Sequence, residues 1–121
     1  MKIAVPVIND SDNPEIAQQL GRAPFYMVYD TEAKTSEKIV NPAQDSPSGA
    51  GVKAAQTIVN TGSAVLLTIR CGDKAYEVLN GAGVKVMEAF VGSAMDNINA
   101  YEEGKMSELE TIHSGHHGKG A

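Results

Sequence analysis

The chain contains one cysteine, Cys71, which follows an apolar run from Ala64 to Ile69 that is typical of a buried parallel strand. In open α/β sheets, ligands bind in the crevice beyond the carboxyl ends of the strands. A cysteine in that crevice could bind metal, because thiolate is the usual protein ligand of iron–sulfur clusters. We therefore predict Cys71 as a metal or cofactor ligand, with Gly72 in the same site. The alternative is a core position, since free cysteine is among the most buried residue types.

A single cysteine supplies one thiolate, whereas iron–sulfur clusters commonly take several protein ligands. A labile cluster that passes between proteins could be held by fewer, with exogenous ligands completing its shell. Two copies of the chain that shared one cluster would supply two thiolates, so the sequence leaves a homodimer open.

A glycine-rich junction, Gly49-Ala50-Gly51, precedes a segment with helical periodicity. A helix start of this kind presents unpaired backbone N–H groups and the positive end of the helix dipole, both of which favour an anion. We predict that these three residues contact an anionic cofactor. The junction lacks the G-K-[ST] ending of a phosphate loop. A plain loop-to-helix junction, in which glycine only relieves backbone strain, is the alternative.

Arg22 lies at the end of a long polar loop, and its planar guanidinium suits an anionic cluster or an organic acid. We predict it as a further cofactor contact. The alternative is a structural ion pair with Asp30 or Glu15.

Three histidines, His113, His116 and His117, lie close together near the end of the chain. Imidazole suits zinc, nickel, copper or iron, so these residues are predicted as an auxiliary metal site. The alternative is a solvated tail, because the segment has no apolar periodicity.

Two hydrolytic chemistries are disfavoured. A metal-dependent nuclease needs converging carboxylates, one of them in the first strand, and that strand has none. Asp10, Asp12 and Glu15 follow it and could bind a hard cation, but they lack the full spacing of a calcium loop. A hydrolytic triad is unsupported because all histidines are in the tail. We expect no enzymatic activity.

The elements that position these residues alternate in type along the chain. Strands are predicted at Lys2–Val7, ending near Pro6, and in a hairpin at Phe25–Tyr29 and Ser36–Val40. Between them Ile8–Gly21 is a long loop, in which Glu15–Leu20 could form one helical turn at most.

Helices and strands then alternate in the second half of the chain. The predictions are a helix at Gly51–Thr61 ended by Gly62, a strand at Ala64–Ile69, a helix capped by Asp73, a strand at Val84–Met87, and a helix that starts at Ser93 and ends at Gly104. This order predicts an α/β fold with a mixed five-stranded sheet, in which an N-terminal antiparallel hairpin joins parallel βαβ units.

Length, composition and charge limit the number of domains, the partners and the compartment that we expect. With 121 residues and 12.7 kDa the chain fits one domain, predicted over residues 1–110 and followed by a disordered His-rich tail at 111–121. A net charge of -5 and a pI near 5.1 disfavour nucleic acid and anionic membranes as partners. No apolar run is long enough for a membrane span. A lone cysteine fits a reducing compartment, which predicts a cytoplasmic protein.

Several short segments occur together in one known family. They are Leu20–Asp30, Asn41-Pro42, Gly49-Ala50-Gly51 with Ala54-Ala55-Gln56, Ala82–Val86 and Tyr101–Lys105. In this respect the chain resembles the dinitrogenase iron-molybdenum cofactor biosynthesis family, the domain shared by NifX-like proteins and the C-terminal part of NifB. The resemblance covers Met1 to about Leu109. Where the family often reads G-x-x-G-P-x-A, this chain has Ile69-Arg70-Cys71-Gly72-Asp73-Lys74-Ala75.

The resemblance implies a ribonuclease H-like, three-layer α/β/α fold and a non-enzymatic function. The protein would bind and carry iron-sulfur or iron-molybdenum cluster precursors between a donor and an acceptor protein. Two other functions remain open from the residues alone. One is a regulatory module that binds a small molecule or nucleotide in the same crevice without metal, and the other is a structural interaction domain.

Overall fold

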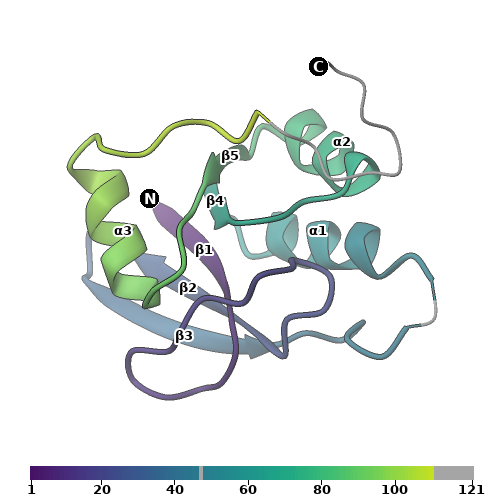
Figure 1. Cartoon of the computed structure of the whole chain (residues 1–121), viewed down its shortest axis with the longest axis horizontal. Coiled ribbons are helices and arrows are strands. Elements are labelled where there is room, and N and C mark those ends of the chain that lie inside the picture. The colour runs from purple at the N-terminus through teal and green to yellow at the C-terminus, as the bar shows by residue number, and fades with distance from the viewer. Residues whose placement is uncertain (47, 111–121) are drawn as a thin grey trace.

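The computed structural model describes residues 1–46 and 48–110, which form a sheet with three helices (Figure 1). The predicted His-rich tail lies outside these residues. The elements are β1 (Lys2–Val7), β2 (Phe25–Asp30), β3 (Thr35–Val40), α1 (Ala50–Asn60), β4 (Val65–Thr68), α2 (Asp73–Gly81), β5 (Lys85–Glu88) and α3 (Ala94–Glu102). Each lies within a residue or two of a segment predicted from the sequence.

The sheet has the order β3-β2-β1-β4-β5. The strand β2 pairs antiparallel with both β1 and β3, whereas β4 pairs parallel with β1 and β5. This arrangement confirms the predicted mixed five-stranded α/β sheet. Because β4 is parallel to both β1 and β5, the carboxyl ends of these three strands lie at the same end of the sheet. The predicted site residues follow the strands there.

Pro6 lies within β1, although β1 is a central strand. The Pro6 carbonyl accepts a hydrogen bond from the Ala17 N–H at 2.8 Å. Because N–H and C=O of a strand residue point to the same side, the donor that proline lacks also faces this loop and not β2. The register with β4 covers only Ile3 and Ala4, so Pro6 leaves the β1–β4 ladder intact.

Alternate residues of the strands face two separate cores. One core, on the side of α1 and α2, contains Ala4, Tyr26, Ala55, Ile58, Leu66, Cys71, Ala75, Leu79 and Val86, among others. The other, on the side of α3, contains Ile3, Val5, Val7, Met27, Leu67, Met87, Ala94 and Ile98, among others. The sheet therefore lies between α1 and α2 on one face and α3 on the other (Figure 1).

Residues 8–21 form the predicted long loop, and Glu15–Leu20, which could have formed one helical turn at most, forms none. This segment instead forms isolated bridges, in which Ile16 pairs with Val7, Glu15 with Ser93 and Gln19 with Arg70. A segment of this length gains more from pairing with strand ends on both sides than from one isolated turn, because helix nucleation is unfavourable. The long loop is thereby fixed across the carboxyl edge of the sheet.

Helix termini follow the sequence signals with one correction. The Ser93 side chain accepts from the Asp96 N–H at 3.1 Å, as a capping residue should, and Gly62 has the left-handed φ of 79° expected after α1. Asp73, however, is the first residue of α2 and not its cap. The cap is Gly72, and the Asp73 carboxylate accepts from the Lys74 N–H instead. None of the helices among the described residues has the length and apolar character needed to cross a membrane.

Candidate functional site

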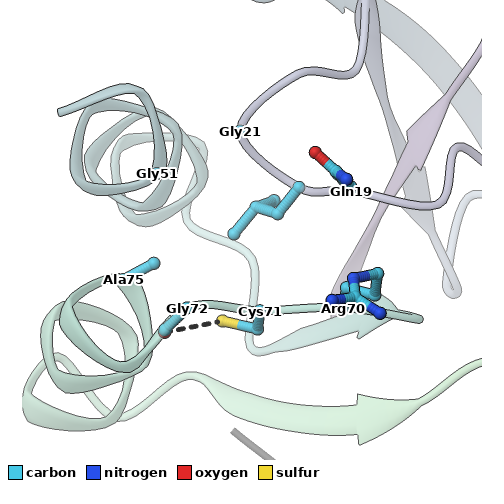
Figure 2. A pocket seen from close by; sticks show the side chains of 8 residues that line it. Gln19, Gly21, Gly51, Arg70, Cys71, Gly72 and Ala75 are labelled. Carbon is cyan, nitrogen blue, oxygen red and sulfur yellow. Dashed lines mark hydrogen bonds between the residues drawn. The ribbon is translucent and has the colours of Figure 1, made fainter. Parts of the chain in front are cut away.

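A pocket of about 230 Å³ opens at the carboxyl end of β4 (Figure 2). Three segments form it, namely the loop before β2, the first turn of α1, and the connection from β4 into α2. The lining residues are Gln19, Leu20, Gly21, Gly51, Arg70, Cys71, Gly72 and Ala75. Three of these, Gly51, Cys71 and Gly72, were predicted as site residues from the sequence, and the structure brings them together.

The N-termini of α1 and α2 both reach this pocket without a side-chain cap. Gly49 and Gly72 are the capping residues, and neither has a side chain to accept from the first-turn N–H groups. The first turn of α1 contains no acidic residue. In the first turn of α2 the Asp73 carboxylate accepts from the Lys74 N–H, so the part of the site that favours an anion is the first turn of α1 together with the two helix dipoles.

Small residues allow the three segments to approach closely. A Cβ on Gly21 would lie 3.0 Å from the Gly51 nitrogen and 3.2 Å from the Gly51 Cα. A Cβ on Gly51 would lie 3.6 Å from the Ala75 Cβ, which is ordinary contact. Gly21 is therefore required by packing against the α1 backbone, and the absence of side chains here leaves room for the pocket.

Cys71 lines the pocket but is only 2% exposed and belongs to the core beside α1 and α2. Its thiol lies 3.5 Å from the Gly72 carbonyl oxygen, to which it donates (Figure 2). Burial raises the pKa of the Cys71 thiol to about 11, because the surroundings solvate a thiolate poorly. The free protein thus holds a neutral thiol near neutral pH. Metal ligation would require loss of that proton, which a bound cation favours.

Arg70 and Gln19 lie on the same side of the pocket and were not predicted as site residues (Figure 2). Both are exposed, and a parallel bridge joins their backbones. The Thr68 hydroxyl donates to the Arg70 carbonyl at 3.2 Å, which helps to fix the turn after β4. A sequence signal for Arg70 existed, since a cationic residue directly follows a buried strand and precedes Cys71.

Arg22, predicted as an anion contact, is not among the residues that line the pocket. Its guanidinium donates to the backbone carbonyls of Gln44 at 2.8 Å and Ser46 at 2.7 Å. It thereby holds the loop that follows β3, in place of the alternative ion pair with Asp30 or Glu15. Gly49 and Ala50, predicted as further anion contacts, also lie outside the lining.

Metal ligands are sparse in this part of the chain. Among residues 1–46 and 48–110, no group of three or more His, Cys, Asp or Glu side chains could hold a metal ion. The predicted auxiliary ligands His113, His116 and His117 lie outside the described residues. The pocket thus offers backbone N–H groups, the Arg70 guanidinium, the Gln19 amide and the Cys71 thiol.

Known structures resemble the chain over most of its length. The apo form of the orange protein from Desulfovibrio gigas is 30% identical, with a TM-score of 0.85, over 89% of this chain and 92% of that one. A Thermotoga protein described as a candidate NifB protein is 31% identical, with a TM-score of 0.80, over 93% and 96%. A Methanocaldococcus jannaschii protein described as a candidate dinitrogenase has a TM-score of 0.65 at 18% identity, over 90% and 94%, and supports the fold alone.

No protein with a curated description matches the chain. A family model described as dinitrogenase iron-molybdenum cofactor, in contrast, matches residues 1–104. This match spans every helix and strand of the structure and confirms the resemblance noted in the sequence. The chain therefore belongs to the dinitrogenase iron-molybdenum cofactor family.

Proposed function

We propose that this protein is a non-enzymatic carrier of an iron-sulfur or iron-molybdenum cluster precursor, which it holds as cargo in the pocket between α1, α2 and residues 19–21. The convergence of two uncapped helix N-termini on one pocket carries this proposal. Sulfide- and thiolate-rich clusters are anions, and the pocket presents a positive potential with Arg70 at its rim. Family membership agrees with such a cargo, since the family is named for this cofactor.

The cargo would be held by hydrogen bonds and electrostatic attraction more than by ligation. The described residues offer no set of three metal ligands, and Cys71 is the one thiol at the pocket. Backbone N–H groups can donate to cluster sulfides, and Arg70 can add a charge-assisted hydrogen bond. Weak ligation suits a carrier, because the cargo must leave again. Cys71 would add at most one bond, formed when the metal displaces its proton.

Further features of the proposal follow from the family and the chemistry of the pocket. The cargo would come from a donor protein and pass to an acceptor in a reducing, cytoplasmic setting. The fold would be of the ribonuclease H-like, three-layer type. The predicted tail histidines His113, His116 and His117 would provide an auxiliary metal site.

Anaerobic loading tests the proposal directly. The protein is incubated with iron and sulfide, or with tetrathiomolybdate, and then desalted and measured by visible absorption and metal analysis. Arg70→Gln should lower retention, whereas the matched control Lys85→Gln should not. Lys85 is also exposed, and it lies at the amino end of β5, at the end of the sheet opposite the pocket. Failure of the wild type to retain either metal in stoichiometric amount would refute the proposal.

Two further variants assign the ligands. Cys71→Ser should reduce retention only modestly if backbone groups and Arg70 hold the cargo. A chain truncated after Ile112 removes the three histidines, and if only this variant loses metal, the site has been assigned to the wrong residues. The second candidate function, nucleotide binding in the same pocket, is tested by the same preparation. Nucleotide retained through native purification would favour it over a metal cluster.

A further inference from the structure

An ordered loop between β5 and α3 displays apolar side chains to solvent. Phe90 is 45% exposed and Val91 is 72% exposed. The loop is nevertheless held firmly, because the fully buried Asn97 accepts from the Phe90 N–H at 2.9 Å and donates to the carbonyls of Phe90 and Ser93 at 3.0 and 2.9 Å. A buried amide with three hydrogen bonds fixes the backbone that carries these side chains. The loop that exposes Phe90 and Val91 is therefore already ordered in the free protein.

An acidic loop lies directly beside this apolar loop. Ile16 donates from its N–H to the Gly92 carbonyl at 2.9 Å, and Ala94 donates likewise to the Pro14 carbonyl at 2.8 Å. The Met95 N–H donates to the Asn13 side chain at 3.2 Å. In Figure 1 the loop after β1 and the segment leading into α3 run along the same end of the molecule. The two loops thus form one continuous surface.

Charge on this surface has a single sign. Residues 8–16 and 89–96 contain Asp10, Asp12, Glu15 and Asp96, all exposed, and neither Lys nor Arg. Ile8, which is 48% exposed, joins the same surface through a hydrogen bond from its N–H to the Glu15 carbonyl at 3.1 Å. The two adjoining loops, residues 8–16 and 89–96, thus combine exposed apolar side chains with exposed carboxylates, and they are named here the acidic-apolar face.

The acidic-apolar face lies next to the candidate pocket along the carboxyl edge of the sheet. Ala89 donates from its N–H to the Thr68 carbonyl at 3.0 Å, and Arg70, two residues after Thr68, lines the pocket. Only the segment from Thr68 to Arg70 separates the acidic-apolar face from the pocket. A partner bound to the face would thus lie close to the mouth of the pocket.

We propose that the acidic-apolar face docks a protein whose contact surface has apolar side chains flanked by Lys or Arg. Apolar side chains on a rigid loop lose little entropy when buried by a partner, and the carboxylates attract a basic partner and repel an acidic one. That this partner delivers or receives the cargo rests on the proposed function. The docking itself does not, because none of its residues lines the pocket.

Titration followed by NMR tests the docking on the metal-free, full-length protein. The probe is a short peptide with a central Leu pair flanked by Lys, and the counterpart has Glu in place of Lys. The Lys peptide should shift amide signals of residues 8–16 and 89–96. Its affinity should fall as NaCl is raised from about 50 to about 300 mM, since screening strengthens with salt. The Glu peptide should produce no such shifts.

Matched variants test whether the peptide binds to this face or to any exposed apolar side chain. Val91→Ser should weaken binding of the Lys peptide by roughly tenfold, as expected for a central contact. Val40→Ser is the control, because Val40 is 65% exposed but lies on β3. Equal binding by the two variants, or shifts centred elsewhere, would overturn the proposal. Cluster retention by Val91→Ser should be unchanged, so a failure of docking and a failure of cargo binding give different results.

Discussion

Gly21 lies so close to Gly51, in the first turn of α1, that a Cβ at position 21 would be only 3.0 Å from the Gly51 nitrogen. This contact joins the long loop after β1 to the helix start at the pocket. It explains why glycine is required at position 21, where the backbone of one segment meets the backbone of another. The geometry of the pocket therefore depends on two residues that have no side chains.

Gly21→Ala should destabilise the protein and widen the gap between residues 19–21 and α1. The new Cβ would meet backbone atoms, which cannot rotate away, so we expect a loss of about 1–3 kcal/mol in the free energy of unfolding. Gly51→Ala is the matched control, because its Cβ would meet the Ala75 Cβ at an ordinary 3.6 Å. Urea unfolding compares the two. Equal stabilities would show that the Gly21 contact is not tight in solution.

Tyr26→Phe should lower stability through the same loop. The fully buried Tyr26 hydroxyl donates to the Leu20 carbonyl at 2.8 Å, next to Gly21. Without the hydroxyl this carbonyl loses its buried partner, which costs about 1–3 kcal/mol. Tyr101→Phe, at a half-buried position on α3, should change the urea midpoint much less. A Tyr26→Phe midpoint equal to that of Tyr101→Phe would argue against this role for the hydroxyl.

The sheet and three of the eight residues that line the pocket were predictable because they depend on local pattern. Apolar runs marked the other four strands, and hairpin pairing marked the charged β3. The alternation of strands with helices implied parallel neighbours, so Cys71, Gly72 and Gly51 were expected at one end of the sheet. The structure bears out that placement. Whether these residues hold a ligand remains a prediction.

Two other lining residues, Gln19 and Leu20, depend on long-range contacts, which side-chain types do not reveal. Gln19 reaches the pocket because its backbone pairs with that of Arg70, and Leu20 is placed by the hydroxyl of Tyr26. The place of Arg22, outside the pocket lining, was hidden from the sequence for a similar reason. Its partners are main-chain carbonyls of Gln44 and Ser46, and a carbonyl is available at every residue, so no sequence pattern marks these two.

Asn97→Ala should loosen the loop that carries Phe90 and Val91. The change removes three hydrogen bonds and leaves the Phe90 N–H and carbonyl without their side-chain partner, whereas the Ser93 carbonyl still accepts from the backbone N–H of residue 97. We expect a loss of about 2–4 kcal/mol and faster hydrogen exchange at the Phe90 amide. Asn99→Ala, an exposed change on the same helix, should affect neither. Unchanged exchange at Phe90 in Asn97→Ala would mean that other contacts fix this loop.

Cys71 should make the protein less stable as the pH rises above about 9. The thiol pKa is raised from 9.0 to about 11 in the folded protein, so the unfolded chain loses this proton first. Stability therefore falls where the folded state binds more protons than the unfolded state, and the contribution of Cys71 is fully present below the unfolded pKa. Across this interval the loss should approach about 2–3 kcal/mol. Urea unfolding at several pH values between about 7 and 11 measures it.

Cys71→Ala isolates this contribution from other groups that ionise in the same range. Burial also raises the pKa of Tyr26, so the wild type should lose stability at high pH for two reasons. The variant retains the Tyr26 effect and lacks the thiol, so its decline above pH 9 should be shallower than that of the wild type. Iodoacetamide provides an independent readout, because a neutral thiol that is 2% exposed should react slowly near neutral pH. Rapid alkylation at neutral pH would contradict the buried, protonated state and would instead favour Cys71 as an accessible thiolate.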